Sequence, residues 1–211
     1  MVLDRYRAFA DRILVPVASR LIRVNPNLVS WVAFLGAVGA GFAFFFGGAA
    51  FLGLALGLIS VNAYLDALDG KIAKMTGKAS VRGDFLDHVL DRYADVFMIG
   101  GIAFSAYCDL RIGTFALLGV LLTSYMGTQA QAVGQGRRYA GLLGRADRLV
   151  LLFLGGLLQL IVSPAGKVVW GVPPIAFQPI EWVLVLFAVL GNLTAVQRAI
   201  STWRGFSAKS P

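Results

Sequence analysis

Six of the eleven acidic residues lie within residues 66–95, between two long apolar runs. Asp66 and Asp69 are three residues apart and Asp87 and Asp91 are four apart, so each pair would lie on one face of its own helix. Two such helices could direct four carboxylates at one point. A carboxylate at membrane depth costs about 2.5–3.5 kcal/mol on insertion scales, so the cluster requires a cation. All of these ligands are oxygens and no cluster of His or Cys lies nearby, so the pattern favours Mg²⁺ or Mn²⁺.

The spacing of these residues reads D-x2-D-G-x2-A-K-x8-G-x3-D-x3-D. It resembles the signature of the CDP-alcohol phosphotransferase family, D-x2-D-G-x2-A-R-x8-G-x3-D-x3-D. Seven of the eight specified residues agree over 26 positions, and Lys74 stands where the pattern has arginine. The alternative is that the charges merely mark the ends of membrane segments. That interpretation would leave Gly70, Ala73 and Gly83 as coincidences.

The resemblance implies transfer of a substituted phosphate from a CDP-linked lipid, CDP-diacylglycerol or CDP-archaeol, to the hydroxyl of a polar alcohol, with release of CMP. By the family pattern, divalent cations at the pyrophosphate are held by Asp66, Asp69, Asp87 and Asp91. Asp91 is in addition expected to be the general base on the acceptor hydroxyl. Small side chains let a nucleotide approach a helix backbone closely. The expected nucleotide-binding residues are Asp66, Asp69, Gly70, Ala73, Lys74 and Gly83.

A basic loop follows the predicted fourth span, and it indicates the kind of acceptor. Several arginines near an apolar pocket would hold a phosphate monoester, although they could also serve only to set the topology. Members of the family that use phosphorylated polyols, such as inositol phosphate or glycerol phosphate, tend to show an S-Y-x-x-A-R-A-E-like run followed by an R-P-E-R-like run. Among them, the chain resembles the branch that makes phosphatidylinositol phosphate and archaetidylinositol phosphate. Here the first run has neutral Gln129 and Gln131, and the second is Arg145-Ala146-Asp147-Arg148. The expected acceptor-binding residues are Arg137, Arg138, Arg145 and Arg148.

We therefore expect an acceptor such as inositol phosphate or another polyol phosphate. An unphosphorylated acceptor (serine, glycerol or inositol) remains open, because the two glutamines favour it. A cation transporter, lined by the acidic residues, is the alternative from another class. A transporter would show internal repeats or broken helices around a midplane site, and the chain shows neither clearly.

Two single residues and the net charge argue against a histidine metal ligand, an internal disulfide and nucleic-acid binding. His88, the only histidine, is adjacent to Asp87, but consecutive helix positions point about 100° apart, so we expect it to be structural. Cys108 is the only cysteine, which excludes an internal disulfide and suggests a packing role. The net charge of +8 comes from basic residues between apolar runs. This pattern favours membrane lipids and phosphate-bearing substrates over nucleic acid.

The elements that must position these residues are membrane helices. With 58% hydrophobic residues in 211, we expect an all-α polytopic membrane protein with six transmembrane helices. Residues 1–23 combine an apolar stripe with a basic face, which predicts an interfacial amphipathic helix, kinked by Pro16 and kept in the mature protein. The six predicted spans are about 28–46, 50–74, 82–106, 112–133, 149–163 and 180–200.

The predicted organisation has three parts: an interfacial helix (1–24), a six-helix membrane domain (25–205) and a cytoplasmic tail (206–211). Basic residues concentrate in alternate connections, which predicts that both termini and the acidic cluster face the cytoplasm from the cell membrane. Many members of the family look like dimers, and glycine-rich helix faces suit close packing in lipid. We therefore expect a homodimer.

Overall fold

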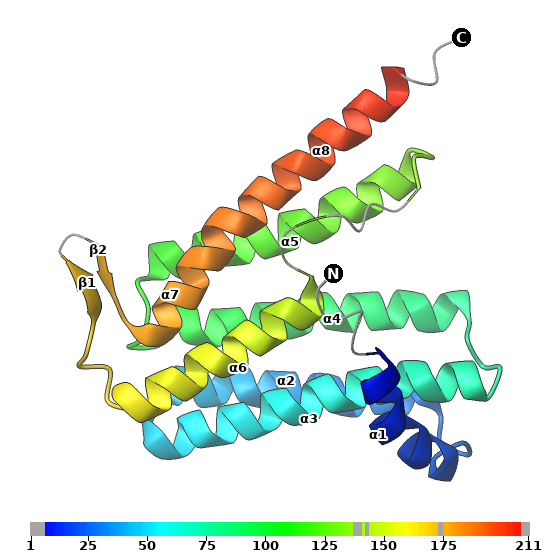
Figure 1. The fold of residues 1–211 in the computed structure, drawn as a ribbon, viewed down its shortest axis with the longest axis horizontal. Coiled ribbons are helices and arrows are strands. Elements are labelled where there is room, and N and C mark those ends of the chain that lie inside the picture. Colours follow the sequence, from blue (N-terminus) through cyan, green and yellow to red (C-terminus); the bar gives the residue numbers. More distant parts are fainter. Residues whose placement is uncertain (1–6, 137–140, 142–143, 173–174, 208–211) are drawn as a thin grey trace.

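The computed structural model describes residues 7–136, 141, 144–172 and 175–207, and they form a bundle of long helices (Figure 1). The elements are α1 (Arg7–Arg20), α2 (Pro26–Phe46), α3 (Gly48–Met75), α4 (Val81–Ala103), α5 (Leu110–Ala132), α6 (Arg145–Val162), β1 (Trp170–Val172), β2 (Ile175–Phe177), α7 (Pro179–Leu186), the π-helix η2 (Phe187–Gly191) and α8 (Asn192–Ser207).

Local chemistry sets the ends of the helices that carry the motif. The Asn25 side chain accepts a hydrogen bond from the Asn27 amide and caps α2. The Ser80 hydroxyl accepts from the Gly83 amide and caps α4 in the same way. Gly47 and Gly48 both have positive φ values, so the tight turn predicted between α2 and α3 is confirmed at residues suited to that conformation.

Helix packing brings the two motif helices together. α2 packs against both α3 and α4, whereas α6 packs against α3 and α7, and α5 packs against η2 and α8. A Cβ atom on Gly101 of α4 would overlap the backbone of Gly41 in α2, so these helices approach as closely as two glycines allow. α1 lies on α3, with Leu14 and Ala18 in one buried cluster with Ile72.

Four helices in the described part of the chain are long and apolar enough to cross a membrane by length and composition: α2, α3, α5 and the run Pro179–Phe206. The two remaining predicted spans correspond to the helices α4 and α6, which are not among these four, and both carry charges of the site. α6 begins at Arg145, earlier than the predicted residue 149, so its first turn includes both arginines of the Arg145–Arg148 run.

Two features of the fold differ from the sequence-based expectation. The chain is not purely helical, because β1 and β2 pair as a short antiparallel hairpin with Trp170 opposite Phe177. The last span is also not one regular helix, because η2 interrupts it. At that point Gly119 and Gly191 are in close contact, and the Thr123 hydroxyl donates to the Gly191 carbonyl at 2.8 Å.

Candidate active site

The four carboxylates of the motif come together where α3 and α4 both pack against α2. Asp69 and Asp91 are buried, and Asp66 and Asp87 are half-buried. Asp66, Asp87 and Asp91 line one narrow cleft, and Asp69 and Asp87 line the cavity next to it. The helical spacing read from the sequence therefore does place both pairs at a common site.

A residue that sequence reasoning missed, Ser30 of α2, also reaches this cluster. Its hydroxyl donates a hydrogen bond to Oδ2 of Asp69 at 2.5 Å, and both residues are buried. This bond connects α2 directly to the carboxylate of Asp69 on α3. No local pattern around Ser30 points to this role, because the contact depends on α2 packing against α3.

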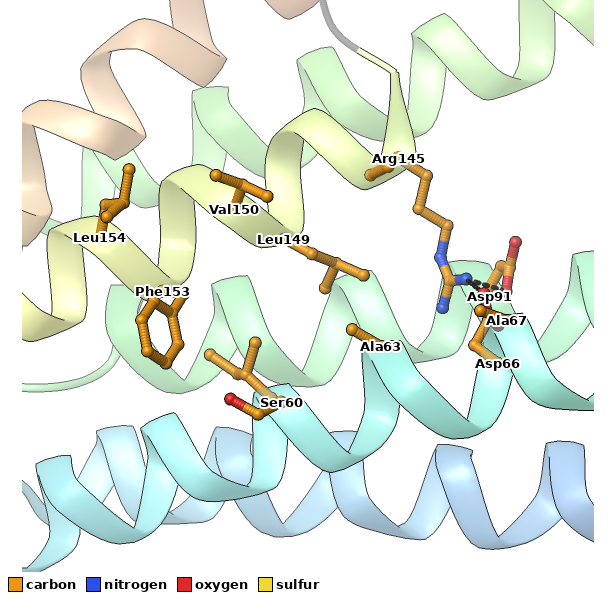
Figure 2. A pocket seen from close by; sticks show the side chains of 12 residues that line it. Ser60, Ala63, Asp66, Ala67, Asp91, Arg145, Leu149, Val150, Phe153 and Leu154 are labelled. Atoms are coloured by element: carbon orange, nitrogen blue, oxygen red, sulfur yellow. Dashed lines mark ion pairs between the residues drawn. The ribbon is translucent and has the colours of Figure 1, made fainter. Parts of the chain in front are cut away.

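Arg145 supplies positive charge to the carboxylates. Its Nη1 atom lies 2.6 Å from Oδ2 of Asp66 and 2.9 Å from Oδ1 of Asp91. Figure 2 shows the side chain extending from the first turn of α6 toward both aspartates. Arg92 contributes a second cation, with Nη1 3.2 Å from Oδ2 of Asp91. Asp91 is therefore held between two guanidinium groups.

Arg148 lies one turn further along α6 and is directed at a different carboxylate. Its Nη2 atom lies 2.8 Å from Oδ2 of Asp95, a buried residue outside the motif. The Nε atoms of Arg145 and Arg148 are buried and lack a hydrogen-bond partner within the described residues. Arg137 and Arg138, the other two arginines expected at the acceptor, lie outside the described residues.

Two cavities meet the cluster from different sides. One, of about 280 Å³, is lined by Asp69 and Asp87 together with the small and basic motif residues Gly70, Ala73, Lys74 and Gly83. A Cβ atom on Gly70 would meet no described atom within 4 Å, so this glycine borders open space. The other cavity, of about 530 Å³, lies between α3 and α6 and runs from Asp66, Asp91 and Arg145 to apolar side chains such as Phe153 and Leu154 (Figure 2).

The donor set fits a hard divalent cation. Four carboxylates at one place supply the oxygen ligands that Mg²⁺ and Mn²⁺ prefer. His88 lies closer to the carboxylates than the angle of about 100° between consecutive helix positions suggested. One ring nitrogen of His88, one oxygen of Asp87 and one oxygen of Asp91 all lie within 4.8 Å of one another. Its Nε2 atom also lies 3.4 Å from Oδ1 of Asp84.

The CDP-alcohol phosphatidyltransferase family profile matches residues 23–194. The archaetidylinositol phosphate synthase of Methanothermobacter thermautotrophicus is 28% identical over 203 residues, which are 96% of this chain and 95% of the relative. The phosphatidylinositol phosphate synthase of Streptomyces avermitilis is 32% identical over 215 residues, which are 96% of this chain and 83% of the relative.

Solved structures share the fold. The crystal structure of Mycobacterium tuberculosis phosphatidylinositol phosphate synthase with CDP-DAG bound has a TM-score of 0.74 and 24% identity, and the match covers 91% of this chain and 94% of that one. The same enzyme in complex with manganese and citrate has a TM-score of 0.74 and 23% identity, covering 89% and 88% of the two chains.

Proposed function

The chain belongs to the CDP-alcohol phosphatidyltransferase family, and from this premise we propose that it transfers a substituted phosphate from a CDP-linked lipid to a polyol phosphate such as inositol phosphate. The acceptor oxygen forms a bond to the phosphorus that carries the lipid, the bond from that phosphorus to CMP breaks, and the hydroxyl proton passes to Asp91. The observation that carries the proposal is the contact of Arg145 with Asp91. It places a group suited to phosphate beside the proposed base.

The proposed metal ligands are Asp66, Asp69, Asp87 and Asp91, with Mg²⁺ or Mn²⁺ as the cation. The cation would neutralise the pyrophosphate and its leaving group. The buried Ser30 hydroxyl fixes Asp69 for this role. The complex of the Mycobacterium tuberculosis enzyme with manganese supports the choice of metal.

The cavity of about 280 Å³ is the proposed site for the nucleotide. Its lining by Gly70, Ala73 and Gly83 lets a phosphate or the cytidine lie against backbone, and Lys74 adds a positive charge. The apolar cavity between α3 and α6 suits the hydrocarbon chains of the donor, because it leads from the carboxylates to apolar side chains. The reacting phosphorus would then lie between the two cavities.

The acceptor phosphate is proposed to bind Arg145 and Arg148, with Arg137 and Arg138 of the adjoining loop. The Nε–H groups of Arg145 and Arg148 have no partner in the described part of the chain, which supports this assignment, because a buried N–H requires an acceptor. A phosphate held there would place a neighbouring hydroxyl near Asp91.

The proposed membrane arrangement has six spans in residues 25–205, made of the four apolar helices together with α4 and α6. The proposed interfacial part is residues 1–24, in which α1 (Arg7–Arg20) is the described helix, and the proposed cytoplasmic tail is residues 206–211. The active site faces the cytoplasm from the cell membrane, where CDP-lipids and phosphorylated polyols meet. The protein is proposed to be a homodimer.

Release of CMP by the purified protein is the test. We would supply CDP-diacylglycerol or CDP-archaeol with Mg²⁺ or Mn²⁺ and compare inositol phosphate, glycerol phosphate, inositol, glycerol and serine as acceptors. We expect metal-dependent release with a phosphorylated polyol. If only an unphosphorylated acceptor supports release, that acceptor replaces the polyol phosphate. If no acceptor does, the transferase assignment fails for this chain.

A further inference from the structure

Two ion pairs connect α4 and α6, one turn apart on both helices. The first joins Asp91 to Arg145 at 2.9 Å, and the second joins Asp95 to Arg148 at 2.8 Å. Asp95 follows Asp91 by four residues, and Arg148 follows Arg145 by three, so each helix presents both partners on one face. The first pair belongs to the proposed catalytic residues. The second has no role in the motif.

α4 and α6 pack mainly against other helices and not against each other. The two ion pairs therefore help to set the position of α6 relative to α4. α4 packs against α2 and α5, whereas α6 packs against α3 and α7. The side chain of Asp95 is 2% exposed and that of Arg148 is 7% exposed. An ion pair with so little water around it has one favourable geometry, because displacing either charge leaves the other buried without a partner.

We propose that Asp95 is a positioning residue for the acceptor site. It holds the Arg148 guanidinium and, through it, the first turn of α6, so that Arg145 reaches Asp66 and Asp91. This inference rests on the proposed polyol-phosphate acceptor. It assigns a role to a fifth aspartate that would contact neither the metal nor the substrate and would act only through the arginines.

The test is the effect of Asp95→Asn on the two substrates separately. We expect the apparent KM for inositol phosphate to rise about tenfold to a hundredfold, as for loss of a charge-assisted hydrogen bond. The KM for the CDP-lipid and the Mn²⁺ concentration for half-maximal activity should each change by less than about threefold, because the contacts of the donor and the metal are kept. Asp11→Asn is the matched control, because it removes an ion pair of the same length, 2.8 Å to Lys71, at an exposed position.

A double variant keeps the test decisive if Asp95→Asn destabilises the protein. Asp95→Asn combined with Arg148→Gln removes both buried charges, so neither is left unpaired. If Asp95 acts through Arg148, the double variant should show no larger acceptor defect than the worse single variant. Additive defects, an equal rise in both KM values, or no rise at all would overturn the proposal.

A binding measurement separates this inference from the proposed function. Thermal stabilisation by inositol phosphate needs no turnover, and thermal stabilisation by CDP with Mn²⁺ reports on the donor side. We expect Asp95→Asn to lose the first and keep the second. If wild-type protein is stabilised by CDP with Mn²⁺ but not by inositol phosphate, the proposed acceptor and the role of Asp95 toward it both fail. If inositol phosphate stabilises the wild type and the Asp95→Asn variant equally, the proposed role of Asp95 fails, but the proposed acceptor stands.

Discussion

The Nη1 atom of Arg145 lies 2.9 Å from Oδ1 of Asp91, so a residue of the predicted acceptor site touches the predicted general base. The same Nη1 atom lies 2.6 Å from Asp66. One guanidinium group therefore connects α6 to both motif helices. A polyol phosphate held by this arginine would have a hydroxyl within reach of Asp91. A divalent cation at the same carboxylates would compete with Arg145 for them.

Replacing Asp91 with Asn should lower the rate of CMP release by about 10²–10⁴-fold, because an amide keeps the shape of the side chain but cannot take up the proton. Metal-dependent binding of CDP should be largely kept, because Asp66, Asp69 and Asp87 remain as carboxylate ligands and the new amide keeps one oxygen. The measurement is single-turnover release of CMP with saturating donor, with Asp11→Asn beside it. A near-normal rate would remove Asp91 from the role of base.

Replacing Asp69 with Asn should weaken metal and donor binding together, because it removes an oxygen ligand, and Asp66→Asn should act alike. Ser30→Ala should have a smaller effect of the same kind, about tenfold, because the hydrogen bond to a charged carboxylate is lost. Titration of Mn²⁺ against activity checks both. Ser19→Ala is the control, since its hydroxyl donates to the Pro16 carbonyl at an exposed position. Wild-type metal dependence in Ser30→Ala would show that the hydroxyl does not support the ligand.

Replacing Arg145 with Ala should raise the apparent KM for the phosphorylated acceptor about tenfold to a hundredfold. Arg148→Ala should do the same, and donor binding should change much less in both variants. Arg145→Ala should in addition bind Mn²⁺ at least as tightly as wild type, because a competing cation is gone from Asp66 and Asp91. Exposed Arg111→Ala is the control. Weaker Mn²⁺ binding in Arg145→Ala would contradict the proposal that Arg145 and the cation compete for Asp66 and Asp91.

Replacing Gly101 with Ala should destabilise the protein by about 1–3 kcal/mol, the usual cost of overpacking, because the new methyl group would overlap the Gly41 backbone. Gly100→Ala is a matched control on the same helix, since a Cβ atom there meets no described atom within 4 Å. Thermal unfolding of both variants in one detergent is the measurement. Equal Tm values would show that α2 and α4 are not so closely packed.

Cys108 should react slowly with N-ethylmaleimide in the folded protein. Burial raises the pKa of its thiol to about 12, with smaller contributions from the nearby carboxylates Glu181 and Asp109. The thiolate is the reactive form, so almost none is present at pH 7 to 8, and the rate should rise as the pH increases toward that pKa. Mass spectrometry of folded and denatured samples checks this. Equal labelling rates in both samples would contradict the partial burial of this thiol.

The positions of the motif carboxylates could be predicted from the sequence. Spacings of three and four residues place side chains on one helix face whatever surrounds the helix, so Asp66 with Asp69 and Asp87 with Asp91 follow from local geometry. The turn at Gly47 and Gly48 follows from the conformational freedom of glycine. These properties depend on a few neighbouring residues along the chain.

Only the tertiary structure decided which side chains meet the carboxylates. Ser30 reaches Asp69 across 39 residues of sequence, and Arg148 reaches Asp95 across 53. The apolar helices carry no local pattern that says which neighbours they pack against, because any apolar face is compatible with many partners or with lipid. The role of Arg145 between Asp66 and Asp91 therefore depends on the packing of α6 against α3, and on the start of α6 at that arginine.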